Sequence, residues 1–148
     1  KKELLLKLSH FHFMIQQKVE LEHKLFLIMK NLSNFRKVFN IENLKWELLE
    51  DESINQQGNI YWFNLSYDDQ KGEGSYLYKM EPKTTSKAHE HTGPEEFFIL
   101  EGDLTDPDGY AYKKGDFVQL SRGSSHSSTT KTGCTAVVTH RGKFIYSD

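Results

Sequence analysis

The sequence predicts an all-β domain, a barrel or a sandwich, preceded by a helical segment. Two observations indicate this. All ten glycines and all three prolines lie from Gly58 onward, so the opening stretch lacks both helix breakers. From Lys45 on, short runs of aromatic and β-branched residues alternate with turn clusters, and no helical crossovers separate them. We therefore expect a helical segment over residues 1–44 and a β domain over residues 45–148.

The opening segment has the apolar periodicity of helices. Apolar residues recur at steps of three and four over residues 4–15 and again over residues 25–39, with Glu20 and Glu22 between the two sets. The pattern predicts two helices, or one long bent helix, up to about Asn40. We expect the stripe in the second set to pack on the β domain or on a second subunit of a homodimer. The residues of this stripe are Leu25, Ile28, Leu32 and Phe35.

Six runs in the second segment have the composition of short β-strands, with turn signals about every 8–12 residues. Alternation along the last of them places Cys134 and Val138 on one face. If that face points inward, Cys134 is a small buried hydrophobe, which we prefer to a reactive thiol. The six runs are Trp46–Leu49, Ile60–Tyr67, Ser75–Met80, Glu95–Leu100, Asp116–Leu120 and Thr135–His140.

Length and composition exclude several classes of protein. The 148 residues suit a single domain, and 36% hydrophobic and 13% aromatic residues exclude a disordered chain. One cysteine excludes an intrachain disulfide and a Cys-rich zinc site. No apolar run approaches the ~18 residues of a membrane span, and no signal peptide is visible. We therefore expect a cytoplasmic protein without a membrane partner.

Charge is small overall but unevenly distributed. The chain has 19 Lys and Arg against 21 Asp and Glu, so it lacks the strong basic excess of a nucleic-acid-binding protein. Residues 1–45 carry nine basic and four acidic residues, a local charge of +5, and the remainder carries −7. A basic amphipathic helix can touch an anionic surface, but a helix that packs on the β domain or a second subunit is the preferred interpretation.

Three histidines and a glutamate have the spacing of a metal site. His89 and His91 lie two residues apart, so on a strand they project to the same face. Glu95 follows a Thr-Gly-Pro turn, and His126 follows a second turn some thirty residues later. Three imidazoles and a carboxylate suit one divalent transition metal, with Fe, Zn, Ni and Mn as candidates. Alternation and spacing favour Glu95 over Glu96 as the carboxylate ligand.

These residues resemble the two motifs of the cupin family. The first motif, His-x-His-x3-Glu-x6-Gly, is matched from His89 to Gly102, and the second is matched at Gly115, Gly123 and His126. Three positions depart from the pattern, none of them a ligand: Ser121 replaces a proline, Thr130 an asparagine and Lys83 a glycine. The resemblance implies a six- to eight-stranded cupin jelly-roll β-barrel that holds a mononuclear metal.

A finer resemblance is to ChrR-type cupins, a group that includes the zinc-binding half of ChrR anti-sigma factors and small diketone-cleaving dioxygenases. It is carried by the stretches from His89 to Glu96 and from Leu100 to Asp103, and by Gly133-Cys134. ChrR proteins have a separate N-terminal zinc domain with His and Cys ligands. Because this chain has no cysteine before Cys134, the resemblance does not extend to the anti-sigma role.

The predicted pocket favours an enzyme but leaves alternatives open. We expect apolar side chains in phase with the ligands to form a wall that suits a small uncharged organic ligand. The preferred function is a metal-dependent dioxygenase acting on a small carbonyl or phenolic compound. The alternatives are a non-catalytic zinc-binding regulatory cupin, and a small-molecule-binding or isomerase cupin. The expected wall residues are Tyr78, Phe97, Ile99 and Val138.

Overall fold

The chain forms two separate units, one helical and one rich in strands. The structure, a computed structural model, describes residues 2–50 and 58–146, and the units are Lys1–Phe39 and Asn40–Asp148. The strand-rich unit takes in residues that the sequence pattern assigned to the helical segment. There, a 3-10 turn, η2 (Ile41–Asn43), is capped by the Asn40 side chain, which accepts a hydrogen bond from the Glu42 amide.

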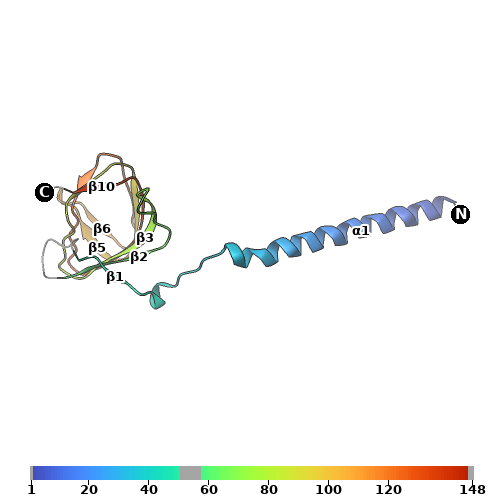
Figure 1. The fold of residues 1–148 in the computed structure, drawn as a ribbon, viewed down its shortest axis with the longest axis horizontal. Helices are drawn as coiled ribbons and strands as arrows, with labels where there is room; N and C mark the ends of the chain where they lie inside the picture. Colours follow the sequence, from blue (N-terminus) through green and yellow to red (C-terminus); the bar gives the residue numbers. More distant parts are fainter. Residues whose placement is uncertain (1, 51–57, 147–148) are drawn as a thin grey trace. The chain divides into compact units, whose positions relative to one another are not determined.

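One long helix makes up most of the first unit. Helix α1 spans Lys2–Asn31, and a 3-10 turn, η1 (Leu32–Phe35), follows it (Figure 1). The predicted break near Glu20 and Glu22 is absent from the described helix, because acidic residues are compatible with a helix. Glu20 in fact forms an ion pair with Lys24, one turn later, at 3.3 Å. None of the described helices has the length and apolarity that a membrane span requires.

The predicted stripe is exposed within the helical unit. Leu25 and Ile28 are 58% and 68% exposed, and the two residues of η1 in the stripe are exposed as well. An apolar stripe of this kind normally gains its stability by packing on another surface. Its burial against the β domain or a second subunit remains a prediction.

Ten antiparallel strands make up the described part of the second unit, in two sheets. The larger sheet has the order β1-β2-β3-β9-β5-β6, with β7 also paired to β5, and the smaller has the order β10-β4-β8. The larger sheet comprises β1 (Glu47–Leu48), β2 (Ile60–Asn64), β3 (Glu73–Met80), β5 (Glu95–Thr105), β6 (Ala111–Lys113), β7 (Phe117–Leu120) and β9 (Cys134–Arg141). The smaller comprises β4 (His89–His91), β8 (Ser125–His126) and β10 (Phe144–Tyr146).

The β character of this unit is as predicted, and each of the six predicted runs overlaps a strand. The closed barrel is not confirmed, because hydrogen bonds among the described strands form two sheets that are not joined into one. Strand number also exceeds the expected six to eight. The additional strands β4, β6, β8 and β10 have only two or three residues, too few to show a periodicity of two.

One face of the larger sheet is layered from polar to apolar. Along β9, His140, Val138, Ala136 and Cys134 are buried and the intervening residues are less so. Burial raises the pKa of the Cys134 thiol to about 12, with a smaller contribution from the charge of Asp103, in line with an inert core residue. Four cross-strand layers result: Glu95 with His140; Phe97, Val138 and Tyr76; Ile99, Ala136 and Tyr78; and Cys134, Met80 and Ile60.

Lys83 has a backbone conformation that favours glycine. Its φ is +64°, and it is the only described residue other than glycine with a positive φ. The cupin pattern has a glycine at this position, so the departure changes the side chain but keeps the turn. A Cβ in the left-handed region costs roughly 1–2 kcal/mol.

Replacing Lys83 with glycine is expected to stabilise the protein. Because the exposed lysine side chain loses little when removed, Lys83→Gly should raise the free energy of unfolding by about 1 kcal/mol. Urea or thermal unfolding would measure the change. The matched control is Lys114→Gly, an exposed turn residue whose φ is not positive, and it should be neutral or destabilising. Equal effects of the two substitutions would contradict the role of φ.

Candidate metal centre

Three imidazoles meet beside the layer formed by Glu95 and His140. His89 and His91 come from β4, and His126 from the neighbouring β8, where it lies directly opposite His89. Their ring centroids are 4.8–5.1 Å apart, and one nitrogen of each lies within 4.8 Å of the others. The structure therefore brings the three predicted histidines together.

Two turns hold the histidine strands in place. Gly93 links β4 to β5 where a Cβ would lie only 1.4 Å from the Arg141 carbonyl oxygen, so the turn packs against β9 in a way that glycine alone permits. In the second turn, the Gly123 amide donates to the carbonyl of His91, and the His91 amide donates to Ser124. Gly123 has a φ of +83°, so Ser121 in place of the motif proline leaves the turn intact.

Glu95 lies beside the imidazoles. Its carboxylate oxygens are 3.8 Å from His91 Nδ1 and 3.8 Å from His126 Nε2, and the residue is only 5% exposed. Burial raises the pKa of Glu95 to about 7, although the charge of His126 opposes the shift. Glu96 points the other way, where it accepts hydrogen bonds from Gln119 and Arg141. The alternation argument for Glu95 thus agrees with the geometry.

Hydrogen bonds fix the orientation of two of the rings. His89 Nδ1 lies 2.9 Å from the carbonyl oxygen of Lys87, and His126 Nδ1 lies 3.2 Å from Asp106 Oδ1. With Nδ1 engaged, the Nε2 atom of each ring is the one left for an ion. Burial lowers the pKa of His126, but the hydrogen bond to Asp106 and the charges of Glu95 and Asp106 outweigh burial and raise it.

Asp106 is the centre of a small polar network. Besides His126, it accepts hydrogen bonds from Ser128 Oγ at 2.7 Å and from the Tyr112 hydroxyl at 2.8 Å. These donors hold the carboxylate in one orientation. Sequence reasoning missed this role, because Asp106 opens an Asp-Pro-Asp-Gly stretch that reads as an ordinary turn.

His91 is the strongest sign of an ion. It is fully buried, and neither ring nitrogen has a hydrogen-bond partner among the described residues. Burial, and then the neighbouring histidines, lower its pKa to about 3, so the ring is neutral at physiological pH. A buried neutral imidazole with a free lone pair on one nitrogen and a nearby carboxyl fits a divalent transition metal. His89, His91 and His126 would hold it, with Glu95 in reach.

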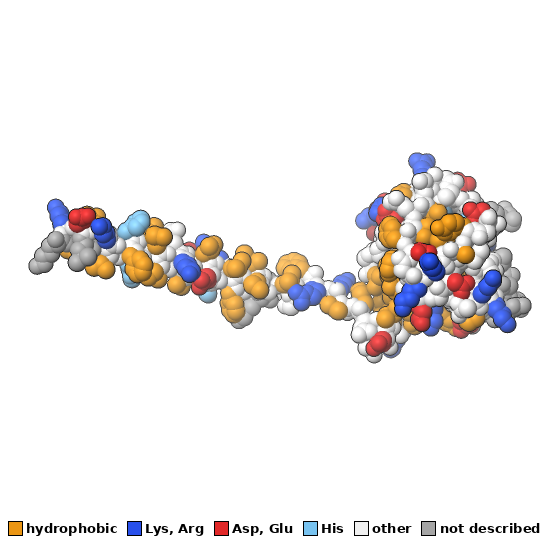
Figure 2. All heavy atoms as spheres, turned by 180° about the vertical axis from the view of Figure 1, so that it is seen from behind, with side chains coloured by type: hydrophobic (Ala, Val, Ile, Leu, Met, Phe, Trp, Pro, Cys, Tyr) orange, Lys and Arg blue, Asp and Glu red, His pale blue; other side chains and the backbone are white. Residues whose placement is uncertain are grey.

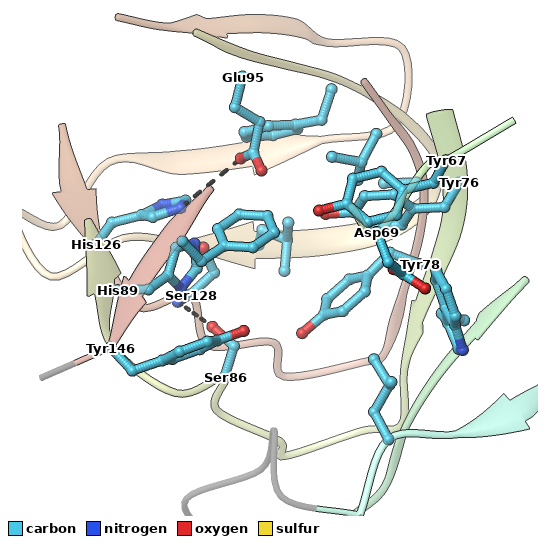
Figure 3. A pocket seen from close by; sticks show the side chains of 17 residues that line it. Tyr67, Asp69, Tyr76, Tyr78, Ser86, His89, Glu95, His126, Ser128 and Tyr146 are labelled. Atoms are coloured by element: carbon cyan, nitrogen blue, oxygen red, sulfur yellow. Dashed lines mark hydrogen bonds and ion pairs between the residues drawn. The ribbon is translucent and has the colours of Figure 1, made fainter. Parts of the chain in front are cut away.

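A cavity of about 310 Å³ opens next to the imidazoles (Figure 3). His89, His126 and Glu95 line one part of it, and Tyr67 and Tyr76 lie across from the histidines. The predicted wall residues Tyr78, Phe97 and Val138 line the cavity. Ile99 does not line it, because it is fully buried in the hydrophobic core, in the layer of Ala136. Alternation predicted the face on which Ile99 lies but not how deep the cavity extends.

Several lining residues were not predicted as a wall. Trp62, Tyr67 and Tyr76 form a cluster of edge-to-face rings, with centroids 5.5–6.3 Å apart. Phe144 and Tyr146 enter from the short strand β10, which has no readable period. His140, next to this wall, is fully buried and stacks on Phe144 with centroids 4.1 Å apart.

The sequence profile of the ChrR cupin-like domain matches residues 36–143. The chain belongs to the ChrR cupin-like family. The profile covers the strand-rich unit and all four predicted ligands. A comparison with curated proteins finds no match.

Solved structures share the fold of this ChrR-like cupin at low identity. A candidate acetylacetone dioxygenase from Methylibium petroleiphilum is 16% identical with a TM-score of 0.67, covering 76% of this chain and 81% of that one. An acetylacetone dioxygenase from Acinetobacter johnsonii is 18% identical with a TM-score of 0.66, covering 76% and 78%. ChrR bound to SigE from Rhodobacter sphaeroides is 15% identical with a TM-score of 0.50, covering 68% and 50%.

Removing a single imidazole is expected to abolish metal binding. The protein purified without chelator should carry about one ion per chain, and His91→Ala or His126→Ala should lose it, because each variant removes one of the three imidazoles whose nitrogens converge within 4.8 Å. Elemental analysis measures the content. His23→Ala, an exposed histidine of α1, is the matched control and should retain the ion. Full occupancy in the His91/His126 double variant would show the ligand assignment to be wrong.

Metal affinity is expected to fall as the pH drops below about 7. Because its pKa is near 7, the Glu95 carboxyl carries a proton in mildly acidic solution, and the ion must displace that proton. The pKa of His126 is also raised, so the ion must displace a second proton there. His91 does not compete, because its pKa is near 3. Titration against a chromophoric chelator from pH 5 to 8 would measure this. Glu95→Gln should reduce the slope of log affinity against pH by about one proton. An unchanged slope would contradict a role for Glu95 as a ligand.

Loss of the Asp106 charge is expected to weaken metal binding without unfolding the protein. Asp106→Asn keeps the shape but removes the charge that orients His126, so affinity should fall by about 10–100-fold. The same chelator titration, with a circular-dichroism melt, measures both quantities. Asp108→Asn, in the same turn but exposed, is the control. Equal affinity losses in the two variants would contradict a specific role for Asp106.

Proposed function

We propose that the protein is a metal-dependent oxygenase acting on a small, uncharged carbonyl or phenolic compound. The observation that carries this proposal is the position of the aromatic cavity, which opens directly onto His89, His126 and Glu95. An ion held there would face a space large enough for a small organic molecule. When bound, the metal would supply Lewis acidity and a site for dioxygen.

The chemistry of the cavity wall argues for an uncharged substrate. None of the described lining residues is Lys or Arg, so the cavity offers no clamp for a phosphate or carboxylate. Arg141 donates a hydrogen bond to Glu96 on the other face of the sheet. The charged groups that do line the cavity, Asp69 and Glu95, are acidic and repel anions. Ring faces in the wall suit planar carbonyl and phenolic compounds.

Glu95 and Tyr76 would handle protons beside the ion. Without an ion beside it, the Glu95 carboxyl has a pKa near 7, so once it is displaced from the metal it can accept a proton from an acidic C–H or phenol around neutral pH. Glu95 would therefore act as a weak, displaceable ligand that takes the proton of the entering substrate. Burial, and then the charge of Glu95, raises the pKa of Tyr76 well above its usual 10, so its hydroxyl stays protonated and can donate to a substrate oxygen.

Oxygen uptake by the Fe(II)-loaded protein tests the proposal. After anaerobic loading, a small β-diketone or a hydroxylated aryl ketone should start oxygen consumption, measured with an oxygen electrode. His91→Ala should be inactive, and His23→Ala should match the unaltered protein. A carboxylate-bearing analogue of the best substrate should react slower by about tenfold or more, because nothing in the wall pairs with its charge.

A regulatory zinc site is the second candidate, and the family match favours it. The ChrR structure named above is a complex of an anti-sigma factor with SigE, and the present chain covers half of that protein. In this case the site would hold zinc tightly and ignore the organic compounds. No oxygen uptake with any compound, combined with zinc at full occupancy after purification, would favour regulation over catalysis.

A further inference from the structure

Helix α1 exposes apolar side chains along its length (Figure 2), and some of them form a second pattern, a seam with a charged centre. Its members recur at alternating steps of three and four, and Lys18 and Glu22 continue the same spacing at its middle. All the apolar members are exposed, between 46% and 68%. They are Leu8, Phe11, Ile15, Leu25, Met29 and Leu32.

This spacing is that of a coiled-coil seam. Alternating steps of three and four average 3.5 residues, so the seam stays on one side of α1 for the ~32 Å from Leu8 to Met29, and Leu32, the first residue of η1, continues the spacing. Apolar flanks widen it, with Met14 and Leu21 on one side and Val19 and Phe26 on the other. The opposite side carries consecutive polar pairs, with Phe13 and Leu27 also exposed on that side. These pairs are Ser9-His10, Gln16-Gln17 and His23-Lys24.

We propose that this seam pairs with the seam of a second copy of the chain, with the two helices antiparallel and centred on residue 20. The seam is symmetric about that point. Ile15 and Leu25 lie equally far from it, as do the other apolar members in pairs, so each apolar residue meets an apolar one. At the centre, Lys18 faces the partner's Glu22, and Glu22 faces the partner's Lys18.

Charge complementarity decides between the two orientations. In a parallel pair, Lys18 would meet the partner's Lys18 and Glu22 the partner's Glu22, which places like charges in the seam twice. The antiparallel pair replaces both repulsions with two ion pairs. A polar layer of this kind sets the register of a coiled coil.

Lys18 and Glu22 are also available for a partner. They lie four residues apart with lysine first, the order that stabilises a helix less than glutamate first. Neither forms an ion pair among the described residues. The two helical pairs that do form, Glu3 with Lys7 and Glu20 with Lys24, have glutamate first and lie at 3.3 Å.

An anionic membrane surface is a less suitable occupant. The local charge of +5 over residues 1–45 would attract it. However, the apolar face that would enter the lipid carries Glu22 and Lys18 at its centre, and a carboxylate there is repelled by anionic headgroups and disfavoured in the acyl region.

Charge reversal in the full-length chain tests the pairing. The unaltered protein should sediment as a dimer, and Lys18→Glu or Glu22→Lys should each weaken the dimer by about tenfold or more. The double variant Lys18→Glu/Glu22→Lys should restore it, because the ion pairs re-form with their charges exchanged. Gln17→Glu, an exposed residue of the polar pairs that forms no ion pair among the described residues, is the matched control and should leave the dimer intact. A monomeric unaltered protein, or a double variant no better than the single ones, overturns the proposal.

Cross-linking tests the orientation. In a Cys134→Ala background, Ile15→Cys and Leu25→Cys chains should form a mixed disulfide when combined, whereas each alone should give little cross-linked product. Strong self-cross-linking of either single variant would indicate a parallel pair and overturn the antiparallel one. Co-sedimentation of the chain with phosphatidylserine vesicles, with loss of the dimer, would assign the seam to membranes instead.

Discussion

The antiparallel ladder between β5 and β9 is the constraint on which the rest of the site depends. Its register puts Glu95 next to His140 and Phe97 next to Val138, so the same hydrogen bonds that hold the core also place the carboxyl and the apolar wall. Since strands have a period of two, a slip of one residue would turn Glu95 outward and bring Glu96 in. The Gly93 turn then fixes β4, and with it the histidines, against the end of this ladder.

Burial acts on the site groups in opposite directions, and only one of the two effects favours an incoming cation. It keeps His91 neutral, so one ring nitrogen has a lone pair for a metal, whereas the raised pKa of Glu95 means that an ion must displace a proton from part of the carboxyl groups near neutral pH. Asp106 adds a fixed negative charge behind His126. The described site thus combines imidazoles with acidic groups beside and behind them, an arrangement that suits a divalent cation better than an anion.

The sequence predicted the parts of the site that follow from local periodicity. His89 and His91 share a face because their spacing matches the strand period, and the same rule separated Glu95 from Glu96 and placed Phe97 and Val138 in the wall. It could not show that Ile99 lies beyond the cavity, because alternation gives a face and not a depth. Asp106 and the β10 aromatics were missed, since a turn and a three-residue strand carry no periodic signal.

Charge was harder to interpret than polarity in the helical unit. Glu20 and Glu22 suggested a break, yet an ion pair on the helix surface accommodates one of them, and the other occupies the centre of the seam. What distinguishes a break from a register-setting layer is the spacing of the apolar residues on either side. Here the steps of three and four continue through Lys18 and Glu22 without a shift, which is compatible with one continuous helix and not with two.

At His91, folding stability and metal binding place opposite demands on the side chain. A buried polar atom without a partner costs about 1–3 kcal/mol, and His91 has two such atoms in the middle of the strand-rich unit. Apolar side chains of the same size would pack there at no such cost, as they do in the Cys134 layer of the same sheet. Among the buried polar atoms without a partner in the described residues, those of His91 are the ones that a metal would use, so an ion that binds only the folded chain would offset part of the cost of its own site.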